Sequence, residues 1–136
     1  MLRDWFNRYR YANTRQFPRL PTSWPIRYKV RTAAENQRVT ATKDVSAGGV
    51  GMWAQEMIPV GAIVQMEIHI LPLKRSIEAQ AQVVRCRPLK GGHFDLGIKF
   101  LVINPQDQAD LADAVQRSLS PRRRARHAGS WWRKAV

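Results

Sequence analysis

Hydrophobic and polar residues alternate along several stretches of this chain. In residues 62–71 every second side chain is apolar, and the same alternation recurs in 25–31, 76–84 and 93–102. A period of two places one set of side chains on each face of a strand, so each stretch predicts a half-buried β-strand. The apolar sets expected to face the core are Ile26, Tyr28 and Val30; Val64, Met66, Ile68 and Ile70; Ile77, Ala79, Ala81 and Val83; and Phe94, Leu96, Ile98, Phe100 and Val102.

Two further strands are expected at about 37–44 and 49–55, where the alternation is less regular. Residues typical of turns separate the six stretches. These breaks lie at 35–36, 47–48, 59–61, 71–72 and 90–92. Six short strands with turns at this spacing predict a small antiparallel barrel or sandwich.

One helix is expected after the last strand, over about 105–119. Asn104 is a favourable N-cap, Pro105 suits the first helical position, and Pro121 ends the pattern. An apolar stripe at helical spacing predicts that the helix packs across the strands. It consists of Leu111, Ala114, Val115 and Leu119.

Positive charge is concentrated at the two ends of the chain. The formal net charge is +13, of which residues 1–19 carry +4, residues 117–136 carry +7 and the long middle only +2. A nucleic-acid-binding core more often distributes its basic residues over one face of the fold. The basic excess therefore resembles two arms on a nearly balanced body.

Cysteine content and hydropathy leave a cytoplasmic protein as the default expectation. Cys86 is the single cysteine, so an intrachain disulfide is impossible. No apolar run is long enough to span a bilayer, and the first fifteen residues lack the apolar stretch of a signal peptide. A chain of 136 residues can form one domain with its own core.

The residues that usually carry catalysis or metal binding form no pattern here. His69, His93 and His127 are scattered, and none lies at metal-ligand spacing with Cys86. No histidine is placed by sequence to activate Ser46, and no Walker lysine follows the glycines. We therefore expect no enzyme, no metal and no cofactor.

Two short segments offer chemistry suited to a small anionic ligand that contains guanine. Arg15 and Arg19 stand four residues apart, and guanidinium groups suit both phosphates and the O6/N7 edge of guanine. Asp44 can accept hydrogen bonds from the opposite edge of guanine, and Ser46 can donate one. Glycines at 48–49 let a flat ligand approach the backbone. Equally, the arginines can be solvated charges and residues 44–49 a plain turn.

The spacing of these residues resembles the PilZ domain family of cyclic di-GMP receptors. The sequence has R-x-x-x-R at Arg15 and Arg19, followed by D-x-S-x-x-G at Asp44, Ser46 and Gly49. The resemblance continues through residues 82–104, with Arg85 near the end of one strand and Leu96-Gly97 in the next, and covers roughly 14–119. It implies a six-stranded antiparallel β-barrel, at about 24–103, with a C-terminal α-helix at about 105–119.

The resemblance also implies a function without catalysis, which is to bind cyclic di-GMP and signal to a partner. The expected ligand-binding residues are Thr14, Arg15, Arg19, Asp44, Ser46, Gly48, Gly49 and Arg85. The arginines would clamp phosphates and guanine edges, and Gly49 would keep the barrel surface open. Binding would fold the arginine segment over the barrel, a disorder-to-order switch. Thr14 precedes the first arginine, where a further arginine favours a stacked pair of ligands, so the stoichiometry stays open.

The two ends of the chain lie outside this resemblance. Residues 1–13 mix arginine with aromatic residues, and residues 120–136 combine dense arginine with Trp131 and Trp132. Tryptophan anchors protein interfaces, so the preferred interpretation is an output surface for a protein partner. A membrane surface, nucleic acid or a solubilising tail are the alternatives.

Two other functions compete with a nucleotide receptor. A small-barrel nucleic-acid binder needs aromatic and basic residues on exposed strand positions, which here are Gln65, Glu67, Glu78, Gln80 and Gln82. A PilZ-like adaptor that acts only through protein contacts, without nucleotide, typically lacks the arginine pair or the D-x-S motif. Both motifs are present, so the nucleotide receptor is preferred.

Overall fold

The computed structural model describes residues 17–31 and 37–119. Within these ranges the elements follow one another as strands with a single long helix at the end. They are β1 (Leu20–Pro21), β2 (Pro25–Val30), β3 (Arg38–Ser46), β4 (Gly49–Ala54), β5 (Ile63–Ile70), a 3₁₀ turn at Leu71–Leu73, β6 (Arg75–Pro88), β7 (Phe94–Ile103) and α2 (Pro105–Leu119).

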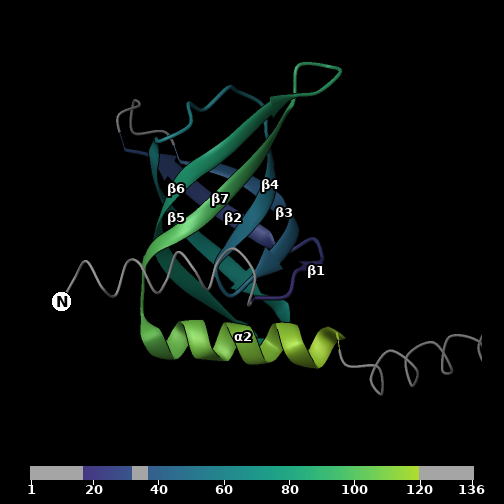
Figure 1. Cartoon of the computed structure of the whole chain (residues 1–136), viewed down its shortest axis with the longest axis vertical. Coiled ribbons are helices and arrows are strands. Elements are labelled where there is room, and N and C mark those ends of the chain that lie inside the picture. The colour runs from purple at the N-terminus through teal and green to yellow at the C-terminus, as the bar shows by residue number, and fades with distance from the viewer. Residues whose placement is uncertain (1–16, 32–36, 120–136) are drawn as a thin grey trace, which may run out of the picture.

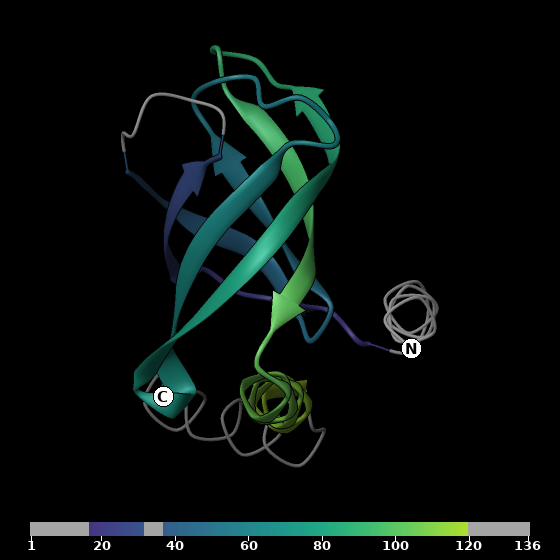
Figure 2. The ribbon, with the colours of Figure 1, turned by 90° about the vertical axis from the view of Figure 1, so that its left-hand side faces the viewer.

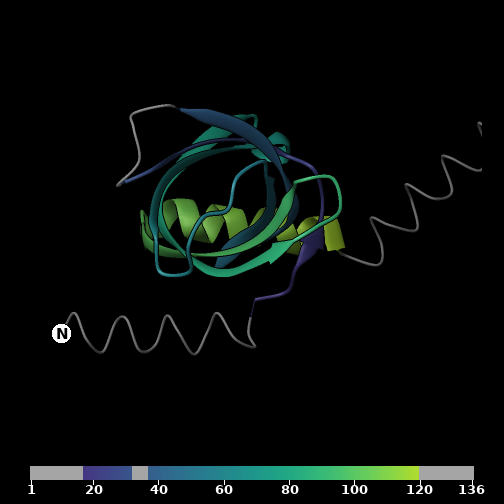
Figure 3. The same ribbon diagram turned by 90° about the horizontal axis from the view of Figure 1, so that it is seen from above.

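Strands β2 to β7 form a closed barrel (Figures 1 and 3). Their order is β3-β2-β5-β6-β7-β4, all neighbours are antiparallel, and a further pairing of β3 with β4 closes the ring. The expected six-stranded antiparallel barrel with a C-terminal helix is confirmed. The two-residue strand β1 was not expected, because it is too short to show a period; it pairs with the end of β3, Leu20 opposite Val45 and Pro21 opposite Asp44.

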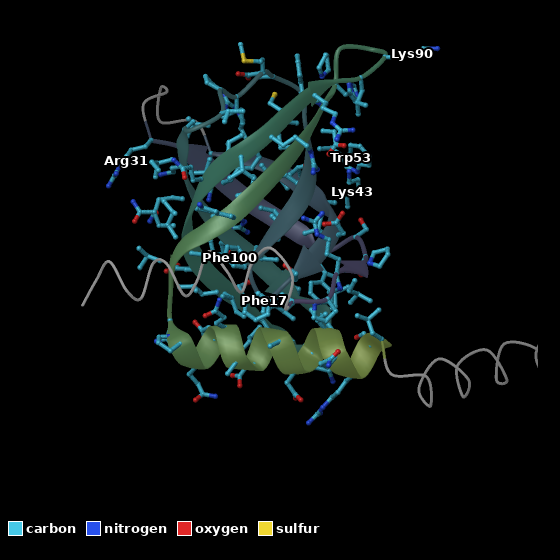
Figure 4. The ribbon with its side chains drawn as sticks, viewed as in Figure 1. Phe17, Arg31, Lys43, Trp53, Lys90 and Phe100 are labelled. Atoms are coloured by element: carbon cyan, nitrogen blue, oxygen red, sulfur yellow. The ribbon has the colours of Figure 1, made fainter. Side chains whose placement is uncertain are left out.

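The barrel interior is filled by the alternating apolar side chains. The predicted inward residues of β5 and β6 are all buried, and Phe100 of β7 is fully enclosed (Figure 4). Burial of one large apolar side chain contributes about 1.5–3 kcal/mol. The period-two pattern therefore identified most of the core correctly.

One predicted inward residue, Val102, points outward and is 53% exposed, while its neighbour Ile103 is only 4% exposed. The reason is a register shift between β6 and β7: Phe100 pairs with Ala81, but Val102 pairs with Gln80. One extra residue in β7 reverses the alternation beyond it, as a β-bulge does.

Strand β6 is longer than its alternation predicts. It continues to Pro88 instead of ending at residue 84, with a second irregularity between Val83 and Arg85. The bulge interrupts the period, and the charged residues that follow resemble a loop in sequence. Arg85 lies in the last part of this strand, which ends at Pro88.

Helix α2 lies across one end of the barrel (Figures 1 and 2). The side chain of Asn104 accepts hydrogen bonds from the backbone N–H of Gln106 at 2.8 Å and of Asp107 at 3.2 Å, which confirms the N-cap. Leu111, Ala114 and Val115 are buried, and Leu119 packs partly against the core. Phe17, the first described residue, lies near the helix (Figure 4) and lines a small cavity with Ala112 and Val115.

The described turns fall where the sequence predicts them. Ala47 and Gly48 connect β3 to β4, and Gly91 and Gly92 form the β6–β7 connection with positive φ angles of 85° and 79°. Glycine adopts such angles without strain. The predicted break at 35–36 lies outside the described residues.

Candidate functional site

Strands β3, β4, β7 and β6 lie side by side and align four residues in one row across the outer face of the barrel. Asp44 pairs with Gly51, Gly51 with Gly97, and Gly97 with Arg85. A second row contains Ser46, Gly49, Lys99 and Gln82. The first row places a carboxylate and a guanidinium at the two ends of a floor made of two glycines.

A β-bulge in β3 sets the direction of Asp44. The register with β4 shifts between Thr42 and Asp44, and the side chains of Thr42 and Val45 on either side are buried. Two consecutive residues, Lys43 and Asp44, therefore both reach the outer side of the strand. Re-aiming a side chain in this way is a common use of bulges.

The two floor glycines make room for the charged side chains beside them. A Cβ atom at Gly51 would lie 3.0 Å from Oδ1 of Asp44, and a Cβ atom at Gly97 would lie 3.1 Å from Cζ of Arg85. Both distances are too short for an undisturbed contact. The carboxylate and the guanidinium thus lie over the glycines instead of extending into solvent.

Gly49 lies where β4 and β7 approach each other closely. A Cβ atom there would lie 2.1 Å from the backbone carbonyl oxygen of Ile98. The missing side chain permits the close approach of β4 and β7, so this glycine is required by strand packing. Gly51 and Gly97 differ from it, because they lie beneath side chains and not against backbone.

The turn that follows β3 is held from several sides. The hydroxyl of Ser46 accepts a hydrogen bond from the Gly48 N–H at 3.2 Å and donates one to the Gly49 carbonyl at 3.4 Å. The side-chain amide of Gln108 in α2 donates to the Ala47 carbonyl at 2.8 Å. Ser46 therefore shapes the turn, and helix α2 contacts it directly.

Arg19 lies beside Asp44 because of β1. The pairing of Leu20 and Pro21 with β3 fixes the chain directly after Arg19, whose Nη1 atom is 4.0 Å from Oδ1 of Asp44. The Arg19 side chain is 64% exposed and that of Asp44 19%. Thr14 and Arg15, the other expected residues of this segment, lie outside the described residues.

These residues surround one pocket of about 520 Å³. It brings together Arg19, Asp44, Ser46, Gly48, Gly49 and Arg85, which are all of the expected site residues that the structure describes. The pocket also includes residues that were not among the expected ligand-binding residues: Val50, Gly51, Val84, Gly97, Ile98 and Lys99. They belong to the site through strand pairing, which alternation within a single strand does not reveal.

A buried carboxylate beside the pocket was also missed. Asp95 of β7 accepts two hydrogen bonds from Nζ of Lys43, at 2.9 and 2.8 Å, and one from Nη2 of Arg85 at 3.4 Å. Nζ of Lys43 also lies 5.4 Å from the centre of the Trp53 ring (Figure 4). Burial alone would raise the pKa of Asp95, but its hydrogen bonds and the charges of Lys43 and Arg85 hold that pKa below its ordinary value.

Metal and membrane features are not found in the described part of the chain. Within residues 17–31 and 37–119, no three His, Cys, Asp or Glu side chains gather as metal ligands. The same residues contain no helix long and apolar enough to cross a membrane.

The PilZ domain family matches residues 13–117 of the sequence. The chain belongs to the PilZ domain family. No curated protein matches the sequence.

Solved PilZ-type structures share the fold. The motility inhibitor MotI/DgrA of Bacillus subtilis is similar with a TM-score of 0.68 and 23% identity, over 78% of this chain and 51% of that chain. The PilZ domain of Escherichia coli YcgR, solved with c-di-GMP, gives 0.59 and 18%, over 86% and 98%. The longer YcgR chain, also in complex with c-di-GMP, gives 0.60 and 20%, over 86% and 50%. This chain spans about half the length of MotI/DgrA and of the longer YcgR.

Proposed function

We propose that this chain is a non-catalytic receptor for cyclic di-GMP that passes the binding event to a partner. The observation that carries the proposal is the pocket in which the two short motifs meet, with Arg19 from the first and Asp44, Ser46 and Gly49 from the second. Its volume, about 520 Å³, is within the usual range of small-molecule pockets, roughly 300–1,000 Å³. Membership of the PilZ family supports the same function.

The chemistry of the pocket suits guanine and phosphate together. Asp44 is an acceptor for the N1–H and amino group of a guanine that lies over the glycine floor. Arg19, largely exposed and only 4.0 Å from Asp44 at its closest charged atoms, has donors available for a phosphate or the O6/N7 edge of the base. Arg85 supplies a second guanidinium at the far end of the floor.

The proposed switch is closure of the arginine segment over the barrel. Because β1 pairs with β3 directly after Arg19, the movement pivots at or before Arg19 and leaves Leu20 and Pro21 in place. Ligand phosphates would draw Arg15 and Arg19 together and order the segment between them. Partner contacts through residues 1–13 and through Trp131 and Trp132 belong to this proposal, and those residues lie outside the described part of the chain.

Titration calorimetry tests the function directly. Cyclic di-GMP is titrated into the purified protein, with GTP and a short single-stranded oligonucleotide as comparisons, and Asp44→Asn serves as the matched variant because it keeps size but removes the carboxylate. We expect selective binding of one or two cyclic di-GMP per chain, weakened at least about tenfold by Asp44→Asn. Heat from the oligonucleotide alone would favour the nucleic-acid binder. If the protein is folded and none of the three ligands gives a heat of binding, an adaptor that works without nucleotide would be favoured.

A second experiment tests the output surface. Removal of residues 120–136 should leave the affinity for cyclic di-GMP within about twofold, because the proposal assigns these residues to a partner and not to the nucleotide. Loss of affinity on truncation would show that the tail takes part in binding and would contradict its assignment to a partner.

A further inference from the structure

The Lys43–Asp95–Arg85 cluster combines contacts of unequal quality. Lys43 holds both oxygens of Asp95 at 2.8 and 2.9 Å, whereas Arg85 reaches one oxygen at 3.4 Å. The negative charge of Asp95 is therefore met chiefly by Lys43. Asp95 is only 9% exposed, and a buried carboxylate without a partner is strongly unfavourable, so this pair is held firmly.

Arg85 is left with unused donors at the edge of the pocket. Among the described residues its one hydrogen bond goes to Asp95, and its Nε atom is buried with no hydrogen-bond partner. Buried donors without a partner are rare and call for an explanation. Here the guanidinium lies over Gly97, on the floor of the pocket.

We propose that Lys43 and Asp95 are positioning residues for Arg85, keeping its guanidinium over Gly97 with donors available for acceptor atoms of the bound nucleotide. Asp95 tethers one end of the guanidinium. Lys43 satisfies Asp95, so that this carboxylate does not take up the remaining donors of Arg85. The proposal rests on the nucleotide-binding function proposed above for the same pocket.

Removal of Lys43 should release Asp95 to capture Arg85. Among the described residues, the other cation in hydrogen-bond contact with Asp95 is Arg85. In Lys43→Met the long Arg85–Asp95 contact should therefore become a full bidentate pair. Cyclic di-GMP then loses its bonds to Arg85, and we expect binding about tenfold weaker, as for the loss of one charge-assisted hydrogen bond. Lys43→Arg keeps the charge and should bind within about threefold of the unmodified protein.

The double variant distinguishes positioning from simple charge. In Lys43→Met/Asp95→Asn the competing carboxylate is gone, and affinity should return to within about threefold of the unmodified protein. If the two substitutions acted independently, the losses of the single variants would multiply and the double variant would bind much more weakly. Asp95→Asn alone removes the tether and should weaken binding slightly. If only local net charge mattered, Asp95→Asn would instead bind more tightly. Lys29→Met, on the exposed face of β2 away from the pocket, is the matched control for loss of one lysine.

A measurement without ligand tests the same claim independently of cyclic di-GMP. The ¹⁵Nε–H signal of Arg85, identified by its loss in Arg85→Lys, is followed by NMR in the free protein. In Lys43→Met it should shift and exchange more slowly with water as Asp95 becomes its partner, and in the double variant it should not. Any of three results would overturn the proposal. The first is an unchanged Arg85 signal in Lys43→Met, and the second is tighter binding in Asp95→Asn. The third is a double variant whose affinity loss equals the product of the two single losses. Absence of any binding by the unmodified protein would contradict the proposed function, and the NMR result would still decide the positioning role.

Discussion

Gly51 and Gly97 lie directly opposite each other on β4 and β7, each covered by a charged side chain from the next strand outward. Asp44 covers the first and Arg85 the second. Neighbouring strands are about 4.8 Å apart, so the two glycines form a narrow floor between opposite charges. This arrangement explains why glycine, which weakens a strand, occurs twice in one cross-strand row.

Alanine substitution should separate the two kinds of glycine in β4. In Gly51→Ala the new methyl group pushes the Asp44 carboxylate by a few tenths of an ångström, and we expect binding of cyclic di-GMP several-fold weaker with stability changed by less than about 1 kcal/mol. In Gly49→Ala the methyl group meets the Ile98 carbonyl, and overpacking against backbone should lower the free energy of unfolding by about 1–3 kcal/mol or more. Urea denaturation and calorimetry on both variants check this; equal stability losses would contradict it.

Substitution of Arg19 should affect binding and not folding. Its contact with Asp44 is 4.0 Å long and largely exposed, and such pairs contribute about 0–1 kcal/mol. We expect Arg19→Ala to weaken binding at least about tenfold, since a charge-assisted hydrogen bond is worth roughly 1.5–3 kcal/mol, while the thermal midpoint of the free protein hardly changes. Arg15→Ala should behave alike, and the double variant should nearly abolish binding.

The matched control for Arg19→Ala is Arg27→Ala, on an exposed position of β2. It removes the same charge away from the pocket and should bind cyclic di-GMP normally. A large loss of stability in Arg19→Ala would mean that this arginine supports the fold, and the receptor proposal would lose its strongest mutational test.

Asp95 should make stability depend on pH in the acid range. The pKa of Asp95 in the folded protein lies below its ordinary value of 3.8, so its contribution is fully present above about pH 4 and is lost as the pH falls through the folded value. Asp95→Asn lacks this contribution. Urea denaturation at pH 7, 5, 4 and 3 measures the free energy of unfolding of the unmodified protein and of Asp95→Asn, and the difference between them should shrink below pH 4. A difference that stays constant to pH 3 would show that the charge of Asp95 does not stabilise the fold.

The N-cap of α2 should contribute to the stability of the fold and not to the binding of cyclic di-GMP. Asn104→Ala removes the two hydrogen bonds to the first turn, which typically costs about 1 kcal/mol and, for a domain of this size, lowers the thermal midpoint by about 4–8 °C. Asn104→Asp keeps an acceptor and should restore most of the loss. Calorimetric affinity for cyclic di-GMP should be the same in all three proteins, because Asn104 does not line the pocket.

Local patterns were sufficient for much of the fold. Alternation depends on the direction of successive Cβ atoms within one strand, so Val64, Met66 and Ile68 could be assigned to the core without knowing their neighbours. Capping depends on four consecutive residues, which is why Asn104 marked the start of α2. The motif residues Asp44 and Ser46 could be singled out because their spacing is also short.

The alignment of separate strands depends on contacts between distant segments, and it became visible in the fold. Bulges turned Val102 outward and aimed Lys43 and Asp44 to the same side, because one extra residue changes the face of everything beyond it. Closure of the barrel brought Lys43 of β3 and Asp95 of β7 together beside Arg85, contacts that no short motif indicates.

Two glycines of β4 show most clearly the difference between what the sequence predicts and what the fold adds. In the sequence Gly49 and Gly51 look alike, two places apart in one glycine-rich segment. In the fold one faces the backbone of β7 and the other the carboxylate of Asp44. The positions of strands and turns could be predicted from the sequence, since they depend on neighbouring residues. The tertiary structure determined what each glycine makes room for, since that depends on atoms from distant parts of the chain.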